Sequence, residues 1–109
     1  MMEELTRKEE QMMLAVHFLK DDAILNTIRK RIKEYTGKDY SLGTIYVPLN
    51  RLHMNGYLKS TQKKVSGSNK PVRYYSVTSK GIDALSNLKE NTDRMWEDFT
   101  KPVVDRRKS

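Results

Sequence analysis

Two helical segments joined by a turn of only four residues, 37–40, are the feature that most restricts how this chain can fold. The first spans about residues 23–35, where isoleucine recurs at the spacing of one helix face before Gly37 stops the helix. The second begins at Ser41, which suits an N-cap, and ends at Asn55-Gly56, which suits a C-cap. So short a connection predicts a helix-turn-helix. The apolar stripe expected on the first of these helices consists of Ile24, Ile28, Ile32 and Tyr35.

The segments on either side of this pair predict a helix before it and a β-hairpin after it. Thr6 and Glu9 have the spacing of a capping box, and the helix that they open runs to Asp21 with an apolar arc wide enough to bury more than one face. Residues 57–65 and 72–78 have the composition of strands, and glycine, serine and proline between them suit a hairpin tip. This order predicts a winged helix-turn-helix, in which the second helix of the pair enters the DNA major groove.

One more helix follows the hairpin. Thr78 suits its N-cap, and an apolar stripe continues to about residue 99. We therefore expect an α+β fold, mostly α-helical. It would comprise a winged helix-turn-helix DNA-binding domain over residues 1–78, a dimerisation helix over 79–100 and a flexible basic tail over 101–109. The residues expected at the dimer interface are Ile82, Leu85, Leu88, Thr92, Met95, Trp96 and Phe99.

The two aromatic residues near the end of this helix favour a partner. Trp96 and Phe99 lie beyond what so small a core needs, so a second copy of the helix is the expected burial site. Packing of the last helix on the first helix of the same chain is the alternative. Both arrangements are compatible in a dimer where the first helix of one subunit meets the last helix of the other.

The positive charge of the chain is concentrated in one stretch. The net charge is +7, and residues 41–80 hold seven basic side chains and no acidic one. No Asp or Glu occurs between Asp39 and Asp83. A stretch of this kind predicts a polyanionic partner, which in the context of the predicted fold is double-stranded DNA.

The helix over residues 41–56 has a side for the core and a side that can read DNA. Its expected core face consists of Leu42, Ile45, Leu49 and Leu52. The opposite side offers hydroxyl, amide and guanidinium groups to bases or phosphates, and Val47 can meet a thymine methyl. The residues of this helix and its cap that we expect to contact DNA are Ser41, Gly43, Thr44, Tyr46, Val47, Asn50 and Arg51.

Two residues of this helix are unusual inside a helix. Gly43 adds no side chain, so backbone N–H groups near the helix N-terminus could approach a phosphate closely. Pro48 removes the bond to the carbonyl of Thr44. We therefore expect a kink, or regular geometry only on either side of the proline, at a cost of ~3 kcal/mol unless relieved.

Basic residues flank the expected hairpin tip. Those expected to contact phosphates or the minor groove are Lys63, Lys64, Lys70 and Arg73. A solvated loop is the alternative. Tyr74 and Tyr75 point to opposite faces of their strand, so at least one packs on the core. Tyr46 either offers its hydroxyl to a phosphate or packs its ring.

The sequence argues against several other classes of function. The absence of cysteine excludes a disulfide framework, a cysteine metal site and a thiol nucleophile, and suits a cytoplasmic protein. His17 and His53 have no second ligand at metal spacing. Since no catalytic triad, carboxylate pair or phosphate-binding loop is present, we expect no enzyme activity, metal or cofactor. No apolar run has the length of a membrane span, and the charged N-terminus is unlike a secretory signal.

Two stretches resemble the PadR family of bacterial transcriptional regulators. They are LGTIYVPLNRLHMNGYLKS, residues 42–60, and KPVRYYSVTSKGIDAL, residues 70–85. The family pattern appears in Gly43-Thr44-Ile45-Tyr46, the step from Leu49 to Leu52, Gly56, Tyr74-Tyr75 and Val77-Thr78-Ser79-Lys80-Gly81. The resemblance covers roughly residues 5–99. Val47 stands where the family often has proline directly after the tyrosine.

The resemblance implies a homodimeric repressor that binds a palindromic operator. It also implies the compact subgroup of the family, in which one C-terminal helix dimerises. One member holds planar aromatic ligands at the dimer interface, which makes Trp96 a candidate ligand wall. A tryptophan that packs in the dimer core is the alternative. A different class of function is a winged helix that docks an acidic protein and binds no DNA.

Overall fold

The computed structural model describes residues 5–64, 67 and 69–99 of the chain. Its elements, in chain order, are α1 (Arg7–Leu19), the short 3₁₀ helix η1 (Lys20–Asp22), α2 (Leu25–Thr36), α3 (Leu42–Met54), β1 (Leu58–Lys64), β2 (Pro71–Val77) and α4 (Ser79–Glu97). The fold is mostly helical with one antiparallel hairpin, as a winged helix-turn-helix requires. The predicted tail over residues 101–109 lies outside the described residues.

Helices α1, α2 and α3 and the base of the hairpin enclose one apolar core. Its largest fully buried side chains are Met12, Met13, Val16, Ile28, Ile45, Leu49, Leu52 and Leu58. The capping box predicted for α1 is confirmed. The Glu9 backbone N–H donates to Thr6 Oγ1 at 3.0 Å, and the Thr6 backbone N–H donates to Glu9 Oε1 at 2.8 Å.

The start of α2 differs from the prediction by two residues. Residues 20–22 continue from α1 as a 3₁₀ turn, and α2 begins at Leu25 rather than at Ala23. The carbonyl of Ala23 accepts a 2.9 Å hydrogen bond from the backbone N–H of Tyr75, so this connection runs beside β2 instead of joining the helix. The cap of α2 was missed because its side chain comes from within the helix: Thr27 Oγ1 accepts from the backbone N–H of Ile24 at 2.9 Å.

Two residues predicted for the core face are exposed. Leu42 is 39% exposed because it is the first residue of α3, one turn before Ile45 enters the core. Tyr35 is 74% exposed in the last turn of α2, and its ring lies over the guanidinium of Arg31. The wide apolar arc of α1 is also only partly covered within the chain, because Leu14 and Phe18 remain exposed.

Pro48 does not divide α3 into two parts. The helix continues from Leu42 to Met54 with the proline inside it. The packing of Ile45 and Leu49, both fully buried on either side of Pro48, stabilises the segment. In proteins, helices are stabilised more by the packing of their apolar face than by the helix propensity of their residues.

The hairpin is close to the predicted one. Strands β1 and β2 pair in register from Leu58 opposite Val77 to Lys64 opposite Pro71. Tyr75 is buried and Tyr74 is half-buried, which confirms that at least one of the two tyrosines packs on the core.

Helix α4 is joined to the end of α3 by three consecutive carbonyl groups. The carbonyl of Asn55 accepts from Lys80 Nζ at 2.7 Å, and the carbonyl of Gly56 accepts from Thr78 Oγ1 at 2.6 Å. The carbonyl of Tyr57 accepts from the backbone N–H of Thr78 at 3.0 Å. The same Thr78 hydroxyl caps α4, as predicted, by accepting from the backbone N–H of Gly81 at 3.1 Å. We call this set of contacts the α3–α4 junction.

Gly81 is buried at this junction, and no residue with a side chain fits at its position. A Cβ atom at Gly81 would clash with the carbonyl oxygen of Tyr57 and would lie only 2.6 Å from a methyl group of Val77. The backbone of α4 therefore packs directly against the segment that leaves α3.

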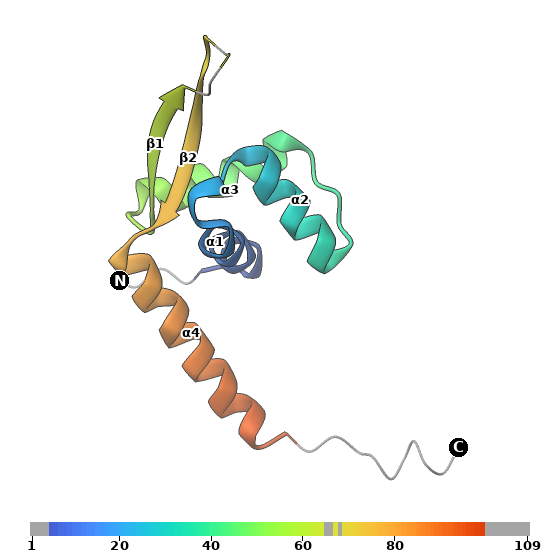
Figure 1. The fold of residues 1–109 in the computed structure, drawn as a ribbon. Helices are drawn as coiled ribbons and strands as arrows, with labels where there is room; N and C mark the ends of the chain where they lie inside the picture. The colour runs from blue at the N-terminus through green and yellow to red at the C-terminus, as the bar shows by residue number, and fades with distance from the viewer. Residues whose placement is uncertain (1–4, 65–66, 68, 100–109) are drawn as a thin grey trace, which may run out of the picture.

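Beyond its first turns α4 projects away from the rest of the fold, on the side opposite the hairpin tip (Figure 1). Leu85 packs against the core, whereas Met95, Trp96 and Phe99 are exposed. The helix ends at Glu97, so Phe99 lies just after it rather than in it. Among the described residues, no helix combines the length and the hydropathy that a membrane span needs.

Substitution of Gly81 by alanine tests the α3–α4 junction. We expect Gly81→Ala to lower the free energy of unfolding by about 1–3 kcal/mol, because the added methyl group overpacks a site closed by backbone. Gly43→Ala is the matched control, since a Cβ at that position meets nothing within 4 Å. Chemical denaturation should show Gly43→Ala equal to or more stable than the parent chain. Equal stability of the two variants would contradict the close packing at Gly81.

Candidate nucleic-acid interface

Helix α3 is held by one face and presents the other to solvent. Ile45, Leu49 and Leu52 are fully buried, which fixes the rotation of the helix on the core. The residues predicted to contact DNA that lie exposed on or beside the other side are Ser41, Gly43, Thr44, Tyr46, Val47 and Arg51, and Asn50 is half-buried among them. The structure therefore brings these seven residues to one surface, which we call the α3 surface.

Arg29 of α2 sets the turn that leads into α3. Its Nε donates to the carbonyl of Tyr40 at 2.6 Å, and its Nη2 lies 2.9 Å from Asp39 Oδ1. Lys33 Nζ lies 3.5 Å from the other oxygen of Asp39. Asp39, the last carboxylate before the acid-free stretch, is thus neutralised by two cations of α2. Gly37 has a φ of +76°, which only glycine adopts readily, and lets the chain leave α2 sharply.

Ser41 and Thr44 form a hydrogen-bonded pair at the start of α3. Ser41 Oγ accepts from the backbone N–H of Thr44 at 3.2 Å and so caps the helix. The two hydroxyl oxygens are 2.8 Å apart, so one hydroxyl donates to the other. The confirmed role of Ser41 is therefore that of an N-cap, and its hydroxyl is already bonded within the chain.

Arg51 is bound to α1. Its Nε lies 3.0 Å from Glu9 Oε2, across 42 residues of sequence. The Arg51 side chain is 62% exposed, whereas that of Glu9 is 5% exposed. The buried carboxylate of Glu9 therefore lies directly beside the α3 surface, although α3 itself carries no carboxylate.

Tyr46 lies on the side of α3 that is next to β2. It borders a shallow hollow of about 220 Å³ together with residues of α2 and β2, including Arg73 and Tyr75. Burial raises the pKa of the Tyr75 phenol, and the hydrogen bond and positive charge of Arg73 partly offset this. Tyr75 therefore stays neutral at physiological pH. Arg73 is half-buried and acts on Tyr75, in contrast to the exposed lysines of the hairpin.

The hairpin presents its lysines outward. Lys63, Lys64 and Lys70 are exposed near its tip. Lys63 Nζ lies 5.2 Å from the centroid of the Tyr74 ring on the neighbouring strand, a distance at which a cation is attracted to the ring face. Among residues 57–64, 67 and 69–77 there is no acidic side chain, so the whole described wing is basic.

The two histidines lie on different helices, His17 on α1 and His53 on α3. His53 Nδ1 is 3.3 Å from the carbonyl of Leu58, so its ring links the end of α3 to β1. His17 is exposed on α1. In the part of the chain that the structure describes, no group of three or more His, Cys, Asp or Glu side chains could hold a metal ion.

Residues 25–87 match the family described as the transcriptional regulator PadR-like family. The match covers more than half of the chain. The chain belongs to the PadR-like family of transcriptional regulators.

Solved structures of PadR-like regulators share the fold. A PadR-like transcription factor from Bacteroides fragilis is 29% identical with a TM-score of 0.72, and the match covers 84% of this chain and 87% of that one. A PadR family regulator from Clostridium difficile is 22% identical with a TM-score of 0.69, over 82% of this chain and 91% of that one. No curated protein matches the chain.

One structure outside the family has the same fold in part. The Orc1 protein of Aeropyrum pernix, solved in complex with DNA, is 24% identical with a TM-score of 0.61. The match covers 76% of this chain but only 24% of Orc1. The likeness concerns the fold of one part of that larger protein.

The structure explains the role of one of the PadR-like motifs in the sequence. In Val77-Thr78-Ser79-Lys80-Gly81, three residues form the α3–α4 junction: Thr78 and Lys80 bind the carbonyls, and Gly81 permits the contact. Gly56 adopts a φ of +84°, which turns the chain from α3 into the hairpin. The motif is therefore structural in this PadR-like chain.

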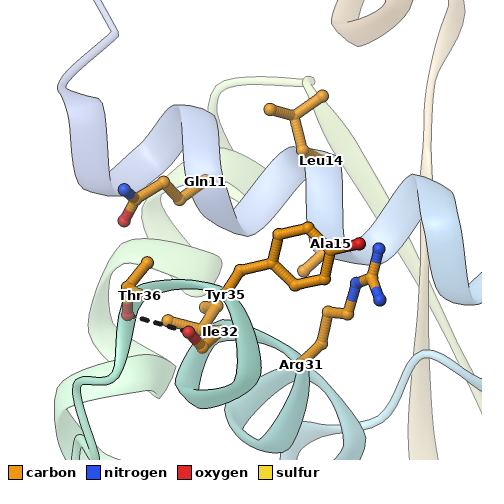
Figure 2. Close-up of a pocket in the computed structure, with 7 residues that line it drawn as sticks. All are labelled: Gln11, Leu14, Ala15, Arg31, Ile32, Tyr35 and Thr36. Atoms are coloured by element: carbon orange, nitrogen blue, oxygen red, sulfur yellow. Dashed lines mark hydrogen bonds between the residues drawn. The ribbon is translucent and has the colours of Figure 1, made fainter.

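A groove between α1 and α2 lies away from the α3 surface (Figure 2). Its volume is about 350 Å³, and its apolar lining residues include Leu14, Ile32 and Tyr35. Arg31 stands at its edge, with its guanidinium carbon 3.4 Å from the ring centroid of Phe18 and 3.9 Å from that of Tyr35. The remaining lining residues are Gln11, Ala15 and Thr36.

Several residues that position this interface were not singled out in the sequence. Arg29 is one of four basic residues between positions 29 and 33, and nothing in the sequence indicated that it binds the turn. Glu9 was recognised as half of a capping box, but its second oxygen binds Arg51. Neither long-range contact leaves a local sequence signal. The only sequence feature that hints at the contact of Glu9 with Arg51 is the position of this acidic residue next to the apolar arc of α1.

Proposed function

We propose that this PadR-like regulator is a homodimeric repressor that binds a palindromic operator in double-stranded DNA through the α3 surface and the hairpin wing. The observation that carries the proposal is the joint exposure of these two regions on an acid-free stretch of chain. The α3 surface offers Thr44, Val47 and Asn50 to base edges. The wing offers Lys63, Lys64 and Lys70 to phosphates.

The assignment of contacts follows from where the side chains lie. Val47 is exposed at the middle of α3, which suits contact with a thymine methyl. Gly43 has open space around its Cα, so backbone N–H groups at the start of α3 can come close to a phosphate. Ser41 serves this contact indirectly as the N-cap, and Tyr46 and Arg73 lie at the edge where α3 meets β2.

Selection of binding sites from random duplex DNA tests this function. The full chain is incubated with a random pool, and bound duplexes are amplified and sequenced. We expect enrichment of an inverted repeat with half-sites about one helical turn, or a multiple of it, apart, because a two-fold dimer presents two α3 helices. Enrichment of no sequence would remove operator binding and favour docking of an acidic protein. A reporter placed behind the selected site then distinguishes repression from activation.

The wing lysines are expected to set part of the salt dependence of binding. In the double variant Lys63→Ala and Lys64→Ala, the slope of log affinity against log salt concentration should become flatter by up to about 0.9 for each phosphate that the wing no longer neutralises. The matched control is the double variant Lys89→Ala and Arg94→Ala, which removes two positive charges from α4. A slope that stays unchanged in the wing variant, measured by fluorescence anisotropy on the selected duplex, would remove the wing from the interface.

The exposed stripe of α4 supports the homodimer. Trp96 is 60% exposed, and its ring meets that of Phe99 edge-on with centroids 4.9 Å apart. Aromatic side chains of this size, left uncovered on a helix that projects from a small domain, are typical of a subunit interface. Leu14 and Phe18 of α1 extend the uncovered apolar surface, as a contact of α4 with the partner's α1 requires. We therefore assign residues 1–78 to DNA binding and residues 79–100 to dimerisation.

Removal of the two aromatic side chains should separate the subunits. The double variant Trp96→Ala and Phe99→Ala should sediment as one chain at micromolar concentration, where the parent chain sediments as two, because truncated interface aromatics cost several kcal/mol of association. Met54→Ala, which truncates an exposed apolar residue at the end of α3, is the control and should remain dimeric. A double variant that remains dimeric would move the interface away from this end of α4.

A planar aromatic ligand at the dimer interface is a secondary proposal. It is supported by the exposure of Trp96, which is 60% exposed near the end of α4. Since Trp96 is the only tryptophan, its fluorescence reports such binding without a label.

A further inference from the structure

Glu9 is buried at a place where a carboxylate needs a partner. Among the described residues it is the only charged residue that is buried, with 4% exposure. Its Oε1 accepts from the backbone N–H of Thr6 at 2.8 Å, and its Oε2 lies 3.0 Å from Nε of Arg51. Burial of an ionised carboxylate is costly unless it is both paired and hydrogen-bonded. Glu9 therefore binds Arg51 to α1, and the two long side chains are not independent.

Arg51 keeps one side of its guanidinium for solvent. A guanidinium is a planar group with five N–H donors, and the bond to Glu9 uses only the donor on Nε. In the part of the chain that the structure describes, this is the one hydrogen bond of the Arg51 side chain, which is 62% exposed. Both terminal nitrogens remain available as a pair, the geometry that binds a phosphate through two parallel hydrogen bonds.

The position of Arg51 on α3 brings that free edge to the α3 surface. Arg51 follows Val47 by one helical turn and Thr44 by two turns, so the three lie along the same side of the helix. All three are exposed. Glu9 is buried whereas Arg51 is exposed, so a phosphate that reaches Arg51 from solvent need not displace Glu9.

We propose that Glu9 is a positioning residue for DNA binding, which holds Arg51 so that the outer edge of its guanidinium meets a DNA phosphate. The inference rests on the proposed function, since it requires that the α3 surface bind DNA. An arginine that is already held in its bound geometry loses less conformational freedom on association than one that moves freely in solvent. The gain comes from order established before binding, not from an additional contact.

Four variants separate positioning from structural support. Glu9→Gln keeps the shape of the side chain but presents an N–H₂ group to one of the two donors that the carboxylate serves. Arg51→Gln removes the proposed phosphate contact, and the third variant combines both changes. Thr6→Ala is the matched control, because it removes the other side-chain hydrogen bond of the α1 capping box, from the Glu9 backbone N–H to Thr6 Oγ1, and leaves the Glu9–Arg51 pair intact.

The affinity for the selected duplex and its salt dependence give the expected pattern. Glu9→Gln should bind about three- to tenfold more weakly with an unchanged salt slope, since Arg51 is still charged but no longer held. Arg51→Gln should flatten the slope by about 0.9 for each phosphate that Arg51 neutralises in the parent chain, and Glu9→Gln added to it should have no further effect. Thr6→Ala should lower the melting temperature and leave the affinity unchanged.

The following outcomes would overturn the inference. Tighter binding by Glu9→Gln would show that the carboxylate competes with phosphate. An equal effect of Glu9→Gln with and without Arg51, or a loss of affinity in Thr6→Ala that matches it, would show structural support only. If Glu9→Gln fails to fold, Arg51→Lys replaces it: lysine keeps the charge but cannot bind Glu9 and a phosphate with one planar group, so affinity should fall at constant slope. Unchanged affinity in Arg51→Lys would overturn the inference.

The two proposals fail in different ways. A parent chain that enriches no DNA overturns both. A parent chain that binds its selected duplex, with Arg51→Gln leaving the salt slope unchanged, overturns the role of Glu9 and Arg51 alone.

Discussion

The packing of α4 on the carbonyl groups at the end of α3 is the constraint on which the arrangement of this protein depends. Three carbonyls in a row, those of residues 55–57, accept hydrogen bonds from Thr78 and Lys80, and the missing side chain of Gly81 allows the backbones to touch. A helix end would otherwise leave these groups to water. Because backbone contacts leave little room for rotation, the direction in which α4 leaves the fold is tied to that of α3. The proposed reading helix and the proposed dimerisation helix are therefore coupled through a joint of a few residues.

Helix α3 is restrained on three sides, which explains how it tolerates a sequence poorly suited to a helix. Arg29 binds the turn before it, Glu9 binds Arg51 near its end, and the α3–α4 junction holds the residues that follow it. Gly43 and Pro48 weaken the isolated helix, but the buried side chains of Ile45, Leu49 and Leu52 are unaffected by either. The exposed side is consequently free to carry residues chosen for contact with a ligand, and a glycine is among them.

Local patterns were sufficient for the elements and for most of the core, and insufficient for contacts between distant residues. The capping box at Thr6, the Ser41 and Thr78 caps and the hairpin were predicted because each depends on neighbouring residues. Tyr35 and Leu42 were misplaced because helical spacing does not reveal where a neighbouring helix stops covering a face. The start of α2 was misplaced because Ala23 pairs with Tyr75 of β2, a contact across more than fifty residues. At the candidate site the exposure of most residues proposed to contact DNA was predicted from their side of α3, whereas the contacts of Arg29 and Glu9 were not.

The uncovered apolar surface favours the proposed second subunit. A chain of this size buries a modest core, and here large apolar side chains remain exposed both at the end of α4 and beside the α1–α2 groove. If both are covered in a dimer, the association energy is gained at surfaces that do not include the α3 surface. The separation of the two α3 helices then follows from the length of α4 and from the angle set at the α3–α4 junction. A change at the dimer interface would reach DNA binding through that angle, without any contact between the interface and α3 itself.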